Sequence, residues 1–299
     1  MKYLKKYRST IINLARYLMA MKVGERLKTI DELSNQLECS VGYVAESLKY
    51  IEKDGAVSLK RQGRNGTVIS AIDMTKLIEL CDIGNIVCAM PLPYTKHYEG
   101  LASGLKAQIN SIPLYFAHMR GANIRAECLI NGVHDMAIMS KMASEQYVKA
   151  GELEIILELG PHSYVPEHRI IYRKGEHDNI KVMGVDSESP DQFLLTEIYK
   201  KDKKVTVKET SYNECLERIA NGNIDAAIWY ASRQSSLEAM GLEERSVEYS
   251  ERFIDASIAV VVAPKQATHL KTMIQSCIDS DQLLSHQERV IKRLIMPTY

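Results

Sequence analysis

Residues 29–69 read TIDELSNQLECSVGYVAESLKYIEKDGAVSLKRQGRNGTVI and hold several closely spaced signals for the start and end of secondary structure. Thr29 and Glu32 have the spacing of a capping box, in which each side chain binds the backbone N–H of the other residue, so a short helix is predicted to begin there. Ser40 is a favourable N-cap for a second helix, which is predicted to end before Gly55. Three apolar residues spaced i, i+4 and i+7 would form its buried face: Val44, Leu48 and Ile51.

After Gly55 the pattern changes from helix to strand. Two β-prone runs, residues 57–60 and 67–69, flank a basic tip rich in glycine, residues 61–66. The order helix, turn, helix, hairpin is that of a winged helix-turn-helix, whose second helix lies in the DNA major groove. An amphipathic stretch at residues 11–21 would supply the first helix. We therefore predict that residues 1–72 form a DNA-binding head.

This run resembles the winged-helix heads of GntR-type transcription regulators. The shared positions are Ser40, Val44, Glu46, Leu48, Glu52, Gly55, Val57, Arg61, Gln62, Gly63, Gly66 and Thr67. Val41 and Ala45 stand where that family usually has arginines, and Arg64 and Asn65 make the tip one residue longer. The resemblance implies a double-stranded DNA operator as partner. The residues expected to contact it are Thr29, Ser40, Val41, Gly42, Tyr43, Lys49, Lys60, Arg61, Gln62, Gly63, Arg64 and Thr67.

The charge is distributed unevenly along the chain. The formal net charge of the 299 residues is zero, but residues 1–72 hold 13 Lys and Arg against 7 Asp and Glu. The rest of the chain has an acidic excess of the same size. A basic head followed by an acidic body suits the binding of a polyanion through one end only.

Cysteine and histidine usage predicts neither disulfides nor metal. The six cysteines contain no C-x-x-C pair, and the histidines have no spacing typical of metal ligands. We expect free thiols and no cofactor. No apolar run reaches membrane length, and Arg16 interrupts the apolar stretch near the start. We therefore predict a cytoplasmic protein with no membrane partner.

Beyond the head, Asp73 is predicted to cap a linker helix within residues 73–82. From residue 83 strands alternate with helices, which predicts an α/β body built on parallel strands. The expected strands are 86–90, 113–117, 136–139, 154–159, 169–172, 181–185, 205–207, 226–229 and 253–262. The expected helices are 96–110, 123–129, 144–150, 191–200, 211–221, 269–279 and 287–295. Capping boxes are predicted at Ser189 with Gln192 and at Ser211 with Glu214.

The body contains an internal repeat. The pattern N-G-x-x-D-x-A-I occurs at residues 131–138 and again at 221–228, with Asp135 and Asp225 at equivalent positions. Each copy reads as a helix end, a turn and a buried strand. Two unrelated loops with common turn chemistry would also give this pattern. Because the flanking order of elements repeats too, we favour two lobes, the first formed by residues 83–173 and 253–299 and the second by 180–250.

Two such lobes resemble the type-2 periplasmic-binding-protein fold, in which the chain builds most of one lobe, crosses to the second and returns. Head and body together most resemble the YhfZ-type family of GntR-like proteins. The resemblance implies a ligand-sensing domain on residues 83–299. In α/β lobes, ligands bind beyond the carboxyl ends of the strands. The candidate ligand-binding residues there are Pro93, Tyr94, Arg120, Gly121, Ser140, Lys141, Asp186, Ser187, Glu188, Ser189, Trp229 and Tyr230.

These candidates have alternative roles. Arg120 would clamp a carboxylate or phosphate, or would simply be a surface arginine. Asp186 and Glu188 would receive an amine, or would help to begin a helix. Trp229 would stack on a ligand or pack in the core. If Arg120 and Lys141 face Asp186 and Glu188, the site suits a small zwitterionic or anionic metabolite.

The function predicted from these features is a ligand-responsive transcription regulator acting as a homodimer, because helix-turn-helix proteins usually bind paired half-sites. Two alternatives remain. One is an enzyme on the same body, although the sequence has no nucleophile elbow, P-loop or dinucleotide-binding glycine motif. The other is a protein whose head has lost DNA affinity and binds a partner. We expect no catalytic residues.

Overall fold

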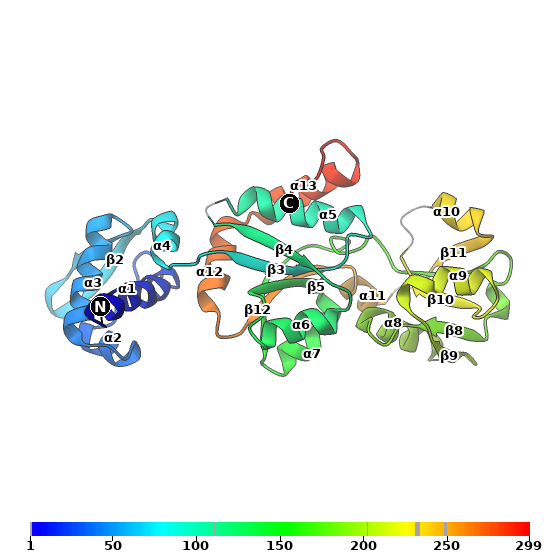
Figure 1. The fold of residues 1–299 in the computed structure, drawn as a ribbon, viewed down its shortest axis with the longest axis horizontal. Helices are drawn as coiled ribbons and strands as arrows, with labels where there is room; N and C mark the ends of the chain where they lie inside the picture. The colour runs from blue at the N-terminus through cyan, green and yellow to red at the C-terminus, as the bar shows by residue number, and fades with distance from the viewer. Residues whose placement is uncertain (1, 111, 202, 231–233, 248–249) are drawn as a thin grey trace. The chain divides into compact units, whose positions relative to one another are not determined.

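The computed structural model describes residues 2–110, 112–201, 203–230, 234–247 and 250–299 (Figure 1). The chain forms two compact units. One consists of Met1–Ile86, Ile109–Leu114 and Gln266–Ile278, and the other of Val87–Gln108, Tyr115–Lys265 and Asp279–Tyr299. We call them the head unit and the body unit.

The head unit has the predicted helix, turn, helix and hairpin. Its elements are α1 (Lys2–Met19), α2 (Ile30–Gln36), α3 (Val41–Asp54), β1 (Val57–Arg61), a 3-10 turn (Gly63–Asn65), β2 (Thr67–Ile72), α4 (Met74–Leu80) and α12 (Thr268–Cys277). β1 and β2 form an antiparallel two-stranded sheet. Leu14, Leu33, Val44 and Ile51 are fully buried, so α1, α2 and α3 share one core. α12, from the far end of the chain, packs against α1 and α4.

The predicted ends of the head helices are confirmed. The backbone N–H of Thr29 donates to the Glu32 carboxylate at 2.7 Å, and the N–H of Glu32 donates to the Thr29 hydroxyl at 3.2 Å, which completes the capping box. Ser40 caps α3, and Gly55 ends it in the left-handed conformation, at φ 80°. One boundary was wrong: α1 begins at Lys2, nine residues before the predicted amphipathic stretch.

The body unit contains two five-stranded sheets. The first has the strand order β4-β3-β5-β12-β6. Its strands are β3 (Ile86–Met90), β4 (Leu114–His118), β5 (Met136–Ser140), β6 (Leu153–Glu158) and β12 (Ala259–Pro264). Figure 1 shows α5 (Lys96–Gln108) and α13 (Ser280–Ile291) on one side of it, and α6 (Ala122–Ile130) and α7 (Lys141–Lys149) on the other. β12 runs antiparallel to β5 and β6, so the chain returns to this lobe as predicted.

The second sheet has the order β11-β7-β10-β8-β9. Its strands are β7 (Arg169–Arg173), β8 (Val182–Val185), β9 (Thr206–Glu209), β10 (Ala226–Trp229) and β11 (Leu242–Ser246). The helices of this lobe are α8 (Pro190–Lys200), α9 (Cys215–Ala220) and α10 (Gln234–Ala239), with 3-10 turns at His177–Asn179 and Tyr212–Glu214. α11 (Glu251–Asp255) leads from the second lobe back to the first.

The internal repeat has the same structural role in both lobes. The Asp135 carboxylate accepts a hydrogen bond of 2.8 Å from the backbone N–H of Val87, at the start of β3. The Asp225 carboxylate accepts one of 2.8 Å from the N–H of Val182, at the start of β8. Each aspartate therefore fixes its own strand beside the neighbouring parallel strand. The prediction of two lobes is confirmed.

The structure corrects several boundaries in the body. β7 was predicted in the first lobe, but it pairs with β10 and β11 and belongs to the second. The predicted strand 253–262 begins instead as α11, because the Ser250 hydroxyl accepts the N–H of Arg252 and starts a helical turn. α10 and β11 were missed. α7 and α13 begin earlier than predicted, since Ser140 and Asp279 cap them.

Both capping boxes predicted in the second lobe are wrong. The side chain of Ser189 makes no capping hydrogen bond to α8, and that of Ser211 makes none to the following turn. The Gln192 amide instead accepts the N–H of Asp186 at 2.8 Å and donates to the carbonyl of Ile228 at 2.9 Å. Gln192 thus joins β8, α8 and β10 instead of capping a helix.

Candidate functional site

A cavity of about 320 Å³ lies in the body unit, lined by residues of both lobes. It is formed by loops that follow strands β3, β4, β8 and β10, the position expected for a ligand in an α/β lobe. Eight of the twelve residues proposed as ligand contacts line it: Tyr94, Arg120, Gly121, Asp186, Glu188, Ser189, Trp229 and Tyr230. Gly121 has φ 83°, a conformation that strains other residues, and a Cβ there would crowd the Glu188 carbonyl oxygen at 3.3 Å.

The remaining four proposed contacts do not line the cavity: Pro93, Ser140, Lys141 and Ser187. The prediction that Lys141 contacts the ligand is wrong, because its ammonium donates to the Glu158 carboxylate at 2.7 Å. This hydrogen bond raises the pKa of the lysine. Ser187 donates its N–H and hydroxyl to Glu209. Ser140 is fully buried and caps α7, accepting the N–H of Ala143 at 3.0 Å.

Arg120 and Asp186 were expected to face a ligand from opposite sides, but they bind each other. The Arg120 guanidinium donates to the Asp186 carboxylate, which is almost fully buried. That carboxylate also accepts the N–H of Tyr212 at 2.7 Å and the N–H of Glu188 at 3.0 Å. Asp186 therefore accepts from three donors, and Arg120 is the counter-charge of a buried anion.

A second arginine in the cavity wall was missed by sequence reasoning. Arg125, on α6, is 3% exposed and donates to the main-chain carbonyls of Ile138 and Met119, both at 3.0 Å. It also donates to the Tyr164 hydroxyl at 3.2 Å. No short motif marks such a residue, because its acceptors come from β5, the end of β4 and a loop far along the sequence.

Two pairs of aromatic rings line the cavity, one pair from each lobe. Tyr98 of α5 lies 5.0 Å from Tyr164 between ring centroids. Tyr212 stacks on Trp229 with centroids 3.6 Å apart and planes inclined by 23°. The pKa of Tyr212 is raised mainly by burial and, to a smaller extent, by the electrostatic influence of Tyr164. The two aromatic pairs therefore interact electrostatically. Of these four, only Trp229 was anticipated.

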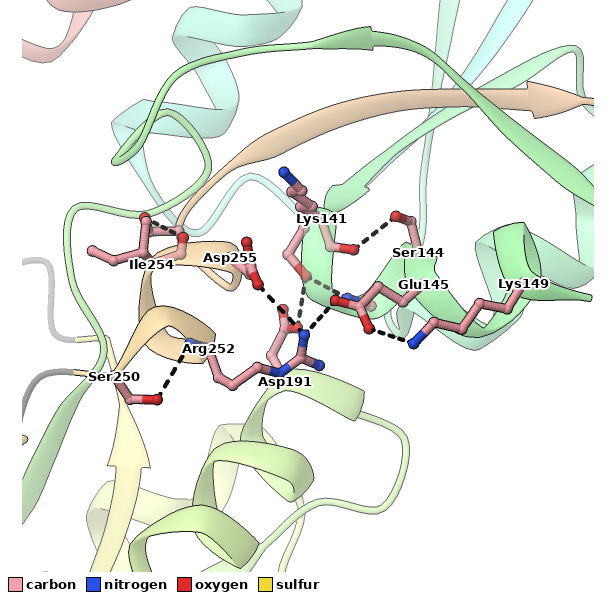
Figure 2. Close-up of polar contacts among 12 residues, drawn as sticks. Lys141, Ser144, Glu145, Lys149, Asp191, Ser250, Arg252, Ile254 and Asp255 are labelled. Carbon is pink, nitrogen blue, oxygen red and sulfur yellow. Dashed lines mark hydrogen bonds and ion pairs between the residues drawn. The ribbon is translucent and has the colours of Figure 1, made fainter.

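Asp191 is a second, partly buried carboxylate in the cavity wall. It lies in the first turn of α8, and one of its oxygens accepts a hydrogen bond of 2.6 Å from the Ser140 hydroxyl of the first lobe. Burial raises the pKa of Asp191 to about 6, against the opposing effects of the Ser140 hydrogen bond and the nearby arginines. Figure 2 shows Asp191 beside Arg252, whose guanidinium is held by Glu145 and Asp255.

His168 is a buried histidine in the cavity wall. It is 8% exposed, and its Nδ1 has no hydrogen-bonding partner among the residues that the structure describes. Burial lowers the pKa of His168 to about 4, so the imidazole is neutral near pH 7. A buried ring nitrogen without a partner is costly, and a bound molecule would supply one.

The candidate nucleic-acid surface of the head unit is exposed. Lys60, Arg61 and Arg64 of the wing are all solvent-exposed, as are Gln62 and Gly63. Arg61 bonds Glu52 of α3 at 2.9 Å, which joins the base of the wing to that helix. The hydroxyls of Thr29 and Ser40 serve as N-caps. On α3, Val41, Gly42 and Lys49 are exposed, Tyr43 is half-buried, and Thr67 on β2 is half-buried too.

The described part of the chain has no group of three or more Cys, His, Asp or Glu residues placed to hold a metal ion. Its cysteines are unpaired. None of the helices in that part has the length and apolar character needed to cross a membrane.

Comparison with known proteins agrees with this architecture. The family model described as the YhfZ C-terminal domain matches residues 73–299. The chain belongs to the YhfZ family. A model described as a helix-turn-helix domain matches residues 22–69. The YhfZ protein of Escherichia coli strain K12 is 46% identical over 297 residues, which are 99% of each chain.

Solved structures place this YhfZ family member among two-lobed binding folds. The crystal structure of YhfZ from Shigella flexneri is 47% identical, covers 75% of this chain and 97% of its own, and superposes with a TM-score of 0.68. The VFT2 domain of BvgS from Bordetella pertussis covers 73% of this chain and 98% of its own, at 15% identity and a TM-score of 0.52. An ancestral arginine-binding protein covers 70% of this chain and 97% of its own, at 16% identity and 0.50. At such low identity the last two show the fold alone.

Proposed function

We propose that the chain is a DNA-binding transcription regulator whose body binds a small metabolite in the cavity and thereby changes the affinity of the head for its operator. The observation that carries this proposal is the combination of a helix-turn-helix head with an exposed basic wing and a two-lobed body that encloses a cavity. Because its operator DNA lies in the cytoplasm, the regulator would act there.

The geometry of the head supports the DNA-binding part. α3 presents Val41, Gly42 and Lys49 to solvent, and the wing carries Lys60, Arg61 and Arg64. Cationic side chains on a wing contact backbone phosphates or the minor groove, while the helix that follows the turn reaches the major groove. Since phosphate contacts release counterions, binding should weaken steeply as salt is raised.

The two-lobed fold supports the ligand-binding part. Proteins with this fold include a substrate-binding protein of an amino acid ABC transporter, at 13% identity and a TM-score of 0.51, and the arginine-binding protein named above. In such a fold a ligand between the lobes favours their closed arrangement. The cavity here is lined from both lobes, so a bound molecule would contact both.

The path of the chain supplies a route from cavity to head. β12 lies between β5 and β6 in the first sheet, and the next helix along the chain is α12. α12 packs against α1 and α4 within the head unit. A movement of the first lobe would thus reach the head through covalently continuous elements. Acting as a homodimer, the protein would convert this movement into a changed spacing of two heads on paired half-sites.

The test is a gel-shift selection of genomic fragments with the full chain at two salt concentrations. We expect a specific fragment to be retained, more weakly at the higher salt. A double variant, Arg61→Ala with Arg64→Ala, should lose most of that retention, while Lys149→Ala on the exposed face of α7 serves as the control for loss of one positive charge. Equal retention of all fragments by parent and double variant would contradict the DNA-binding assignment.

A further inference from the structure

The charges in the cavity wall argue against an anionic ligand. Among the residues that the structure describes, two arginines line the cavity, and one of them, Arg120, is the counter-charge of buried Asp186. If a ligand carboxylate took Arg120, Asp186 would be left as an uncompensated buried anion, which costs several kcal/mol. Arg125 is anchored by two main-chain carbonyls and a tyrosine hydroxyl, and these hold β4 and β5 together.

The carboxylates are arranged differently. Three carboxylates in the described part of the chain line the cavity: Asp186, Glu188 and Asp191. Asp191 is partly buried, and only one of its oxygens, Oδ1, accepts a hydrogen bond from a described residue, the Ser140 hydroxyl. Two arginines act on it electrostatically, Arg125 and Arg252, but the guanidinium of Arg252 is bonded to Glu145 and Asp255. Glu188 is exposed and adds a second negative charge to the wall.

The aromatic rings supply a surface that a cation prefers. Ring faces carry partial negative charge and attract an ammonium or guanidinium group within about 6 Å of the centroid. Tyr98 and Tyr164 from one lobe and Tyr212 and Trp229 from the other line the same cavity as Asp191. Flat aromatic walls also accept the apolar part of a ligand.

His168 gives an independent sign that the cavity is built for a polar ligand. Its Nδ1 is buried and has no partner among the described residues, although the ring lies in the cavity wall. Because the imidazole is neutral, this nitrogen accepts a hydrogen bond in one tautomer. An N–H of a ligand amine or guanidinium would satisfy it.

We propose that the cavity binds a small organic cation, a protonated amine or a guanidinium on an apolar or flat body, with its charge against Asp191 and its body between the two aromatic pairs. A carboxylate on the ligand is not required, because both arginines in the described part of the wall, Arg120 and Arg125, are already engaged by protein groups. This assignment rests on the proposed function, in which the same cavity is the sensor site.

The test compares compounds that share a skeleton and differ in charge. Phenethylamine is paired with phenylalanine and with 3-phenylpropionate, and agmatine is paired with arginine. Trp229 is the only tryptophan of the chain and lines the cavity, so its fluorescence reports occupancy, with isothermal titration as the second measurement. We expect at least one amine to bind about tenfold or more tightly than its carboxylate-bearing partner, which is about 1.4 kcal/mol.

Two isosteric variants make the result specific to Asp191. Asp191→Asn keeps an acceptor for Ser140 but removes the charge, and should weaken amine binding about tenfold while leaving any binding of 3-phenylpropionate unchanged or stronger. Asp178→Asn makes the same substitution at a side chain that is fully exposed and outside the cavity, and should bind as the parent does.

Tighter binding of phenylalanine, arginine or 3-phenylpropionate than of the matching amine would overturn the proposal. So would an Asp191→Asn variant with parental amine affinity, or the absence of binding by every compound at millimolar concentration. These outcomes are separable from failure of the regulator function. If a carboxylate binds and alters DNA affinity, the regulator function stands and the preference for a cation is wrong. If an amine binds without altering DNA affinity, the preference for a cation stands and the regulator function is wrong.

Discussion

The Ser140 hydroxyl donates a hydrogen bond of 2.6 Å to the Asp191 carboxylate, and this bond joins the two lobes of the body. Ser140 ends β5 in the first lobe and caps α7, while Asp191 begins α8 in the second. A buried bond to a carboxylate is stronger than one between neutral groups. Ser140 was expected to contact a ligand itself. It instead holds the carboxylate that we assign to ligand recognition.

Ser140→Ala should lower the free energy of unfolding by about 2 kcal/mol or more, since it removes both a helix N-cap and a bond to a partly buried carboxylate. Urea denaturation measures this. Ser144→Ala is the matched control: Ser144 is equally buried, but its hydroxyl only donates to the Lys141 carbonyl, and its loss should cost about 1 kcal/mol. Equal effects of the two substitutions would contradict the role given to Ser140.

The pKa of Asp191 predicts a pH dependence of stability. Because its folded-state pKa of about 6 lies above the ordinary value of 3.8, the folded protein binds more protons than the unfolded chain between these values. This carboxyl therefore makes the free energy of unfolding fall as pH rises from about 4 to about 6, by up to about 3 kcal/mol.

Asp191→Asn should abolish that contribution. The informative quantity is the difference between parent and variant in unfolding free energy, measured across this pH range. His97 and His168, whose pKa values burial lowers to about 4, act in the opposite direction in both proteins and cancel in the difference. A difference that does not change with pH would show that Asp191 titrates as an exposed carboxyl does.

Arg120 and Asp186 should behave as a coupled pair. Arg120→Ala leaves a buried carboxylate without its counter-charge and should destabilise the fold by about 2 kcal/mol or more. Asp186→Asn combined with Arg120→Ala should recover part of that loss, with a coupling energy of about 1–3 kcal/mol in a double-mutant cycle. Strictly additive effects would show that Arg120 and Asp186 are not coupled. Arg120 would then be available to bind an anionic ligand.

The close packing of α5 against α13 predicts that an added side chain at Gly100 destabilises the fold, whatever the function of the protein. A Cβ added at Gly100 would lie 2.9 Å from the Cα of Gln287, whose side-chain amide bonds the carbonyls of His97 and Ser163. Gly100→Ala should therefore cost about 1–3 kcal/mol through overpacking. Gly42→Ala, in a helix with nothing within 4 Å of the added Cβ, should be neutral or stabilising by up to about 1 kcal/mol. Thermal unfolding of both variants checks this.

In the wing, Arg64→Ala should weaken binding to duplex DNA and reduce the slope of log affinity against log salt by about 0.9, the value for one phosphate contact. Fluorescence anisotropy over a salt series measures it, with Lys149→Ala as the control. An unchanged slope would remove Arg64 from the DNA interface.

Local signals in the sequence predicted the elements of the head and most strands of the body, because capping residues and glycines act within a few positions of themselves. Thr29, Ser40, Asp73 and Gly55 all have the predicted roles. The repeat around Asp135 and Asp225 predicted two lobes because both aspartates fix a neighbouring strand.

The cavity wall was predicted only in part, because its chemistry depends on tertiary contacts. Arg120 and Asp186 were rightly placed at strand ends, but their pairing arises only when the lobes come together. Tyr98, Tyr164 and Tyr212 come from a helix, a loop and a turn, and no spacing in the sequence unites them. Asp191 was predicted only as part of a helix start, which gives no sign that it lines the cavity and bonds Ser140.

The most direct test of the account is the affinity of the full chain for its selected operator, measured by anisotropy with and without the amine that fills the cavity. The account predicts a change of about 5- to 150-fold, the usual range of coupling between two sites, and its loss in Asp191→Asn. An operator affinity that stays the same while Trp229 fluorescence shows the cavity to be occupied would contradict it.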